Sequence, residues 1–390
     1  MNSTVESIRP SATLAIAAKA KELAAKGVRI CSFAAGEPDF DTPQVIKDAA
    51  CRAIAAGQTK YTAAKGMPAL CEAVAAKFRR VNGISYDSAT EIIVSSGGKQ
   101  SLFFAFQALL DRGEEAIVPS PFWLSYPEMI RLAGGRARFV RTSARSGYKL
   151  TPEQLRRAVR PRTRAVVLNY PSNPTGAVYT ASELRALGET AVELGLWIVA
   201  DEMYERMVYT GEPFASIASL SPAIRARTVT VNGCSKAYSM TGWRIGYAGA
   251  PAEVVRAMTA CQSHCASNPC TPAQFAALAA LTDPAAEEAV QPMLRAFAER
   301  SERIYALLRA VKGVRVAKPA GAFYIFPNVK AFGLGSIEFC HRLLEERHVA
   351  AVPGAPFGDD GCIRFSYACS MENIEEGMAR FRDFCDSLRR

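Results

Sequence analysis

Short apolar segments alternate with longer segments of helical character over most of the first 290 residues. Apolar runs that predict strands lie at 91–96, 116–119, 137–140, 164–168, 196–200, 228–231 and 244–248. Segments 98–110 and 181–194 predict helices between them. This alternation of strand and helix predicts an α/β protein with a mainly parallel sheet that has helices on both faces.

The pattern changes near residue 290. A charged segment at 292–311 predicts a long helix, and short strand candidates follow it at 314–316, 322–326, 349–352 and 362–366. This order predicts a smaller α/β domain, which we expect the turn-rich N-terminal residues to join. We therefore expect a large domain at 45–290 and a discontinuous small domain at 1–44 and 291–390, which a chain of 390 residues can accommodate.

The composition is that of a globular protein, with 49% hydrophobic and 22% charged residues. The net charge of +10 is spread along the chain, and no nucleic-acid-binding motif accompanies it. A solvated basic surface is the first explanation of this charge, and the binding of anionic ligands is the second. Eleven scattered cysteines indicate reduced thiols, and the group Cys261, His264, Cys265 and Cys270 does not match a zinc spacing, so no metal is expected. No signal peptide or membrane-spanning run is visible, which favours a cytoplasmic protein.

The segment from Asn232 to Tyr247 carries the most chemical information. Lys236 follows the apolar run 228–231, and Arg244 comes eight positions later. A lysine at the carboxyl end of a strand faces the crevice in which α/β sheets bind ligands, and once desolvated it is a nucleophile for an aldehyde. An arginine binds phosphate in a bidentate manner. Pyridoxal phosphate (PLP) contains both an aldehyde and a phosphate, so Lys236 and Arg244 together suit it. The alternative interpretation is that Lys236 is an ordinary surface lysine.

Further polar residues follow other predicted strands. Asp201 ends an apolar run, and a buried carboxylate there needs a cation such as a protonated pyridine nitrogen, unless it only caps the next turn. Tyr204 could donate a hydrogen bond to the phenolic oxygen of the cofactor or simply pack. Two prolines and a glycine make 170–176 a rigid loop, in which Asn173 can point its amide at a ligand.

Three more positions have both a chemical and a structural interpretation. Gly97 and Gly98 offer backbone amides to a phosphate at a helix N-terminus, or form only a tight turn. Trp123 could stack on an aromatic ring or pack in the core. Arg364, between Ile363 and Phe365, predicts a partly buried guanidinium that binds a substrate carboxylate or an internal one.

Together these segments resemble the fold type I, class I aminotransferases, near the bacterial aspartate and aspartate/prephenate aminotransferases. The similarity extends from about Pro10 to the final helix, and the segments that carry it occur in the family's order at 35–40, 170–176, 201–204, 235–236 with 241–247, and 363–367. The resemblance implies the fold type I architecture, PLP as cofactor and a homodimer.

The resemblance also implies how the cofactor is held. Lys236 would form the Schiff base and move the proton, so it is the predicted catalytic residue. The pyridine nitrogen would pair with Asp201, and the ring would stack on Trp123. The other implied cofactor contacts are the phenolic-oxygen residues Tyr204 and Asn173, and the phosphate residues Gly98, Lys99, Arg244 and the neighbouring subunit's Tyr61.

Substrate contacts follow from the same resemblance. Gly36 and Arg364 would hold the α-carboxylate, with Trp123 and Asn173 beside them. Lys99 and Arg9 match basic positions that bind the distal carboxylate in aspartate-acting relatives, although two solvated surface charges are the alternative. One departure is visible, because Gly233 occupies a position where many relatives carry a phosphate-binding serine.

The predicted reaction is a ping-pong transamination. The expected donor is aspartate or glutamate, and the expected acceptors are 2-oxoglutarate and oxaloacetate, with prephenate as a further candidate. Aromatic or alanine specificity, a PLP-dependent β-lyase and a synthase of the cyclopropane amino acid are alternatives on the same fold. A PLP-binding transcription regulator is disfavoured because no DNA-binding domain precedes Gly36, and a nicotinamide dehydrogenase because no Gly-x-Gly-x-x-Gly follows the first strand.

Overall fold

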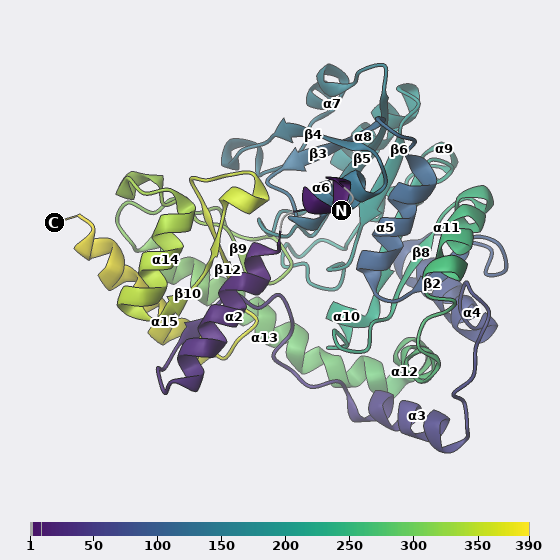
Figure 1. The fold of residues 1–390 in the computed structure, drawn as a ribbon, viewed down its shortest axis with the longest axis horizontal. Helices are drawn as coiled ribbons and strands as arrows, with labels where there is room; N and C mark the ends of the chain where they lie inside the picture. The colour runs from purple at the N-terminus through teal and green to yellow at the C-terminus, as the bar shows by residue number, and fades with distance from the viewer. Residues whose placement is uncertain (1–2, 9, 390) are drawn as a thin grey trace.

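A seven-stranded sheet forms the centre of the computed structural model, which describes residues 3–8 and 10–389 (Figure 1). The strand order is β2-β8-β7-β6-β5-β3-β4. All neighbours are parallel except β8, which is antiparallel to both β2 and β7. The strands are β2 (Ile92–Ser95), β3 (Glu115–Ser120), β4 (Arg136–Arg141), β5 (Thr163–Asn169), β6 (Trp197–Asp201), β7 (Thr228–Gly233) and β8 (Gly246–Gly249). The expected mainly parallel α/β sheet is confirmed.

Both faces of this sheet carry a hydrophobic core. Ile117 and Val118 are neighbours in β3, yet they belong to different buried clusters, because successive side chains of a strand point to opposite faces. One cluster contains residues of α5 (Gly98–Leu109), α6 (Ser125–Leu132) and α11 (Ala252–Cys265). The other contains residues of α7 (Pro152–Ala158), α8 (Ala181–Glu193) and α9 (Pro222–Arg225). Burial on both faces explains why the strands read as continuous apolar runs.

Two small sheets lie beside the large one, on the left of Figure 1. Strands β11 (Val352–Pro353), β12 (Ile363–Ser366) and β9 (Tyr324–Ile325) form an antiparallel sheet. Strand β1 (Cys31–Ser32) pairs in parallel with β10 (Val349–Ala350), so an N-terminal segment joins C-terminal elements. This pairing supports the discontinuous small domain, whose boundaries near residues 45 and 290 stay a prediction.

The other helices surround these sheets. In the small lobe they are α2 (Ala12–Ala25), α14 (Ser336–Arg347) and α15 (Met371–Ser387), while α13 (Pro284–Arg309) runs along the bottom between the lobes (Figure 1). Helices α3 (Gln44–Ala55), α4 (Pro68–Lys77) and α12 (Thr271–Thr282) pack together. The short helical segments are α1 (Ser3–Glu6), α10 (Cys234–Ala237), η1 (Phe78–Asn82), η2 (Ala144–Ser146), η3 (Ile217–Ser219), η4 (Lys330–Phe332) and η5 (Ala355–Phe357). None of the helices in the described part of the chain combines the length and apolar character needed to cross a bilayer.

Two expected elements were wrong in detail. The expected strand at 314–316 forms only one bridge within the described chain, in which Arg315 and Asn328 exchange two backbone hydrogen bonds at 3.1 and 2.7 Å. The long helix begins at Pro284, not Pro292, because Asp283 accepts a hydrogen bond from the Ala285 N–H at 2.9 Å and caps this end. Pro292 lies inside the helix.

Candidate active site

The carboxyl ends of three parallel strands bring the main candidates to one edge of the sheet. Asn169 at the end of β5 lies opposite Asp201 at the end of β6, and the Asn169 amide donates to the Asp201 backbone carbonyl at 3.1 Å. Lys236 lies on α10, directly after the end of β7. The sheet topology therefore brings a carboxylate and an amine into the same crevice.

Lys236 has the properties of a nucleophilic amine. Its Nζ donates a hydrogen bond to the Gly36 carbonyl at 2.5 Å. Burial lowers the pKa of Lys236 to about 8, with the charges of Arg244, Arg364 and Lys99 acting in the same direction and Glu37 opposing them. A substantial fraction of the amine is therefore neutral at mildly alkaline pH.

Asp201 is a buried carboxylate that has no cationic hydrogen-bond partner among residues 3–8 and 10–389. It is 5% exposed, and its carboxylate accepts hydrogen bonds from the Tyr126 hydroxyl at 2.5 Å and the Met203 N–H at 3.3 Å. Burial raises the pKa of Asp201 to about 6, although both hydrogen bonds and the Lys236 charge oppose this shift. Such a group favours a cation brought by a ligand.

Arg364 is also buried without a matching charge. Its Nη1 donates to the Asn173 Oδ1 and its Nη2 to the Ala34 carbonyl, both at 3.0 Å, while its Nε has no partner in the described part of the chain. None of the described carboxylates forms an ion pair with it, so the alternative of an internal ion pair is not supported in this part of the chain. Burial lowers the pKa of Arg364, and an incoming carboxylate would compensate that cost.

Tyr204 lies between these groups. Its hydroxyl is 2.9 Å from the Tyr324 hydroxyl, and burial raises its pKa well above the ordinary value. Asn173 and Tyr204 thus lie in the same cluster, in which the amide oxygen of Asn173 accepts a hydrogen bond from Arg364.

A cradle of glycines and one arginine forms the other end of the site. Gly97 has a φ of +87°, and a Cβ added to it would lie 2.3 Å from the Arg244 Nη2, so the guanidinium rests on this glycine. A Cβ at Gly246 would lie 2.1 Å from the Gly98 nitrogen, which shows how closely β8 approaches the start of α5. A cation beside free amides at a helix N-terminus suits a phosphate.

The departure at Gly233 fits this close packing. A Cβ at position 233 would lie 3.0 Å from both the Gly246 Cα and the Ile245 carbonyl oxygen. A serine there would therefore require the β8 backbone to give by a few tenths of an ångström, and glycine offers no hydroxyl to a ligand at this position.

The remaining candidates lie at the margin of the cluster. The Lys99 Nζ lies 5.0 Å from the centre of the Trp123 ring, and that ring meets Tyr126 edge-to-face at 5.3 Å. Partial desolvation lowers the pKa of Lys99, and the Arg244 charge adds to this effect. Tyr61 is 87% exposed and does not join the cluster within the described chain, whereas Arg9 lies outside the described residues.

Sequence reasoning missed Tyr126 and Tyr324. Tyr126 comes three positions after Trp123 at the start of α6, and Tyr324 lies in the apolar segment that becomes β9. The proximity of Tyr126 to Trp123 was its only sequence signal, and Tyr324 had none, because a tyrosine within an apolar segment more often packs in the core.

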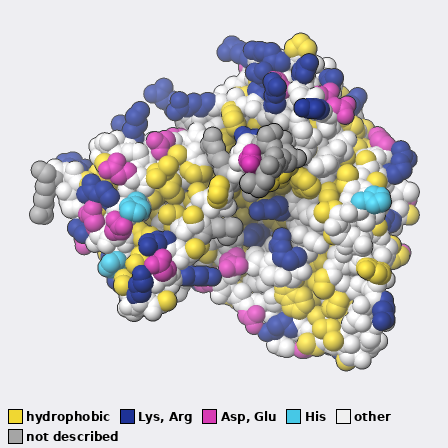
Figure 2. Space-filling view, in the orientation of Figure 1, with side chains coloured by type: hydrophobic (Ala, Val, Ile, Leu, Met, Phe, Trp, Pro, Cys, Tyr) yellow, Lys and Arg dark blue, Asp and Glu magenta, His cyan; other side chains and the backbone are white. Residues whose placement is uncertain are grey.

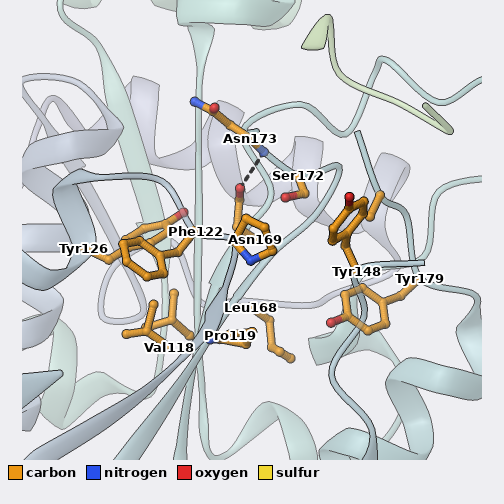
Figure 3. Close-up of a pocket in the computed structure, with 13 residues that line it drawn as sticks. Val118, Pro119, Phe122, Tyr126, Tyr148, Leu168, Asn169, Ser172, Asn173 and Tyr179 are labelled. Atoms are coloured by element: carbon orange, nitrogen blue, oxygen red, sulfur yellow. Dashed lines mark hydrogen bonds between the residues drawn. The ribbon is translucent and has the colours of Figure 1, made fainter. Parts of the chain in front are cut away.

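A small pocket adjoins the site and shares Tyr126, Asn169 and Asn173 with it. Figure 3 shows Phe122 and Tyr126 on one side of this pocket and Tyr148 and Tyr179 on the other. The dashed line marks the hydrogen bond from the Asn173 N–H to the Asn169 Oδ1, at 2.8 Å. On the surface, Lys and Arg side chains lie in the hollow at the middle of the view in Figure 2.

Comparison with known proteins decides the family. The model for class I and II aminotransferases matches residues 28–381. The chain belongs to the class I and II aminotransferase family. It is thus an amino-group-transferring enzyme of a family whose general trait is the use of PLP.

Individual relatives match over nearly their whole length. An aspartate aminotransferase of Geobacillus stearothermophilus is 49% identical, with 98% of each chain covered. An aspartate/prephenate aminotransferase of Cereibacter sphaeroides is 46% identical over 100% of this chain and 99% of its own. The solved aspartate aminotransferase of Thermus thermophilus with maleate superposes with a TM-score of 0.94 at 46% identity, covering 98% of this aminotransferase and 99% of the solved chain.

Proposed function

We propose that this aminotransferase binds PLP through Lys236 and transfers the amino group of aspartate or glutamate to a 2-oxo acid. The observation that supports this proposal most is that Lys236, with a pKa of about 8, and Asp201 lie in one crevice. Asp201 is buried and has no cationic hydrogen-bond partner among the described residues. The relatives named above support the substrate class, with oxaloacetate, 2-oxoglutarate and prephenate as candidate oxo acids. Eleven free cysteines support the further proposal of a cytoplasmic location.

The residues present fit PLP. Lys236 offers the amine, Asp201 would pair with the pyridine nitrogen, and Arg244 with the Gly98 and Lys99 amides would hold the phosphate. Trp123 would lie against the ring, and Tyr204 and Asn173 would face the phenolic oxygen. When bound, PLP supplies an aldehyde for imine formation and a ring that stores electrons.

The residues of the chain then act on the substrate. Arg364, with Gly36, Trp123 and Asn173 nearby, would orient the α-carboxylate through two parallel hydrogen bonds. The Lys236 Nζ would take the proton from the substrate α-carbon, because a neutral amine can act as a general base, and would deliver it to the carbon that the PLP aldehyde supplies. Asp201 stays ionised while it faces a cation, so it keeps the proton on the ring nitrogen. Lys99, together with Arg9, would bind a distal carboxylate.

We further propose a homodimer in which Tyr61 completes the phosphate site of the partner. Tyr61 is 87% exposed in the single chain, and an aromatic residue left so open suits an interface.

A Lys236→Ala variant tests the proposed function. The wild-type protein incubated with PLP is expected to be coloured, and borohydride should fix the label on Lys236. The variant should bind PLP and amino acid but have almost no turnover in an assay with aspartate and 2-oxoglutarate. Normal turnover of the variant, or label at another lysine, would contradict the proposal.

A further inference from the structure

Tyr324 links Tyr204 to Arg364 in the candidate site, although no motif in the sequence drew attention to it. It lies on β9 with 1% of its surface exposed. Its hydroxyl is 2.9 Å from the Tyr204 hydroxyl, and the centre of its ring is 4.6 Å from the guanidinium carbon of Arg364. One side chain therefore contacts both Tyr204, which is proposed to bind the phenolic oxygen of the cofactor, and Arg364, which is proposed to bind the substrate carboxylate.

The hydroxyl contact sets the direction of a hydrogen bond. Tyr204 has one hydrogen to donate, and the proposed function requires it to point toward the phenolic oxygen of PLP. The Tyr204 oxygen must then accept the hydrogen of Tyr324. Because hydrogen bonds in a chain polarise one another, this acceptance makes Tyr204 a stronger donor.

The Tyr324 hydroxyl occupies space that is open because residue 36 is a glycine. A Cβ added to Gly36 would lie 2.9 Å from this oxygen, so a side chain at position 36 would push it away. The Gly36 carbonyl also accepts the hydrogen bond of Lys236, which places the same short loop against both groups.

The ring contact fixes the plane of a guanidinium. Arg364 also lies 5.1 Å from the centre of the Phe357 ring, and its two terminal nitrogens are held by Asn173 and Ala34. A guanidinium that stacks on aromatic faces loses little further freedom when a carboxylate binds.

We propose that Tyr324 is a positioning residue with two separable effects. Its hydroxyl directs the hydrogen of Tyr204 toward the cofactor, and its ring holds Arg364 in the plane that receives the substrate carboxylate. This proposal rests on the proposed function, since it needs PLP at Lys236 and a carboxylate at Arg364.

Two substitutions in the PLP-bound enzyme separate the effects. Tyr324→Phe keeps the ring and removes the hydroxyl, so the spectrophotometric pKa of the bound cofactor should rise by about half a unit as Tyr204 becomes a weaker donor. The dissociation constant of maleate, a dicarboxylate that does not react, should stay within about twofold of the wild-type value. Tyr324→Leu removes the ring and should raise that constant about tenfold.

Tyr86→Phe is the matched control. The Tyr86 hydroxyl is buried 3.0 Å from the Thr230 Oγ1, so this variant also removes one of two paired hydroxyls, but outside the site. It should change neither the cofactor pKa nor maleate binding. If Tyr324→Leu fails to fold, Tyr324→Met replaces it, because an unbranched side chain fills the space without an aromatic face.

The outcomes distinguish a failure of the proposal for Tyr324 from a failure of the proposed function. A wild-type protein that gains no pH-dependent cofactor spectrum contradicts the proposed function. An unchanged pKa in Tyr324→Phe, while Tyr204→Phe does shift it, overturns the effect of the hydroxyl. Unchanged maleate binding in the variant without a ring overturns the effect on Arg364.

Discussion

Burial makes the charged forms of Lys236 and Asp201 costly in the folded chain, and a suitable ligand would relieve that cost. Burial lowers the pKa of the amine to about 8 and raises that of the carboxyl to about 6. Each shift means that the folded chain disfavours the charged form. A cofactor that contributes an aldehyde and a cationic nitrogen relieves both costs, so its binding also stabilises the fold.

The reactivity of Lys236 should follow its shifted pKa. In the cofactor-free protein, the rate of covalent PLP attachment should rise with pH through about 8, where the amine becomes neutral, and then level off. Stopped-flow absorbance from about pH 6 to about pH 10.5, a range that includes this pKa and the ordinary pKa of lysine, measures this rate. A rate that continues to climb above pH 10 would mean that the amine is an ordinary lysine.

Asp201→Asn should stabilise the cofactor-free protein while it impairs the enzyme. The folded pKa of about 6 exceeds the ordinary 3.8, so the folded state binds more protons between these values and wild-type stability falls as pH rises through that window. At pH 8 the variant should gain about 1–3 kcal/mol in free energy of unfolding. Urea unfolding at pH 8 and near pH 3.5 measures it, because the gain should vanish at the lower pH.

Lys99 should discriminate between substrates. Lys99→Ala is expected to raise the Michaelis constant for aspartate by about tenfold or more, because the distal carboxylate loses a charged partner, with little change for alanine. Steady-state kinetics with both amino acids measure the ratio. Equal changes for the two would remove Lys99 from substrate recognition.

At the scale of elements, the antiparallel return from β7 to β8 places both Lys236 and Arg244 within one short connection. Ser239 and Arg244 have φ values of +52° and +57° there, and the Arg244 Nη1 donates to the Thr241 carbonyl at 2.8 Å. Local geometry therefore fixes the distance between the amine and the proposed phosphate ligand.

Gly246→Ala tests the contact between β8 and α5. The new Cβ would meet the Gly98 nitrogen at 2.1 Å, so the variant should lose at least about 2 kcal/mol of stability and bind PLP more weakly. Gly242→Ala is the control, because a Cβ there meets nothing within 4 Å. Thermal unfolding and PLP titration compare the two variants, and equal behaviour would show that the close approach has no consequence.

Much of this element structure could be predicted from the sequence. Apolar runs located the strands, and the carboxyl ends of parallel strands meet at one edge, so Asp201, Asn173 and Lys236 could be expected together. Periodicity does not encode direction, however, so the reversal of β8 could not be predicted. The contacts of Tyr126 and Tyr324 were also hidden, because they depend on where segments distant in sequence meet.

At the scale of the whole molecule, the proposed homodimer predicts complementation. Mixed dimers of Lys236→Ala and Tyr61→Ala chains should contain one site in which both residues are intact. Co-refolded equal mixtures should therefore reach about one quarter of wild-type activity if chains pair at random. Activity no higher than the average of the separate variants would indicate that Tyr61 acts within its own chain.

The lowered basicity of Lys236 has a consequence for the newly made protein. A pKa of about 8 leaves more of this amine neutral near physiological pH than in an ordinary lysine, so small reactive aldehydes can attach to it before the vitamin does. Prompt occupation of the crevice would then protect the protein as well as activate it, and a vitamin-starved cell would accumulate chains blocked at position 236.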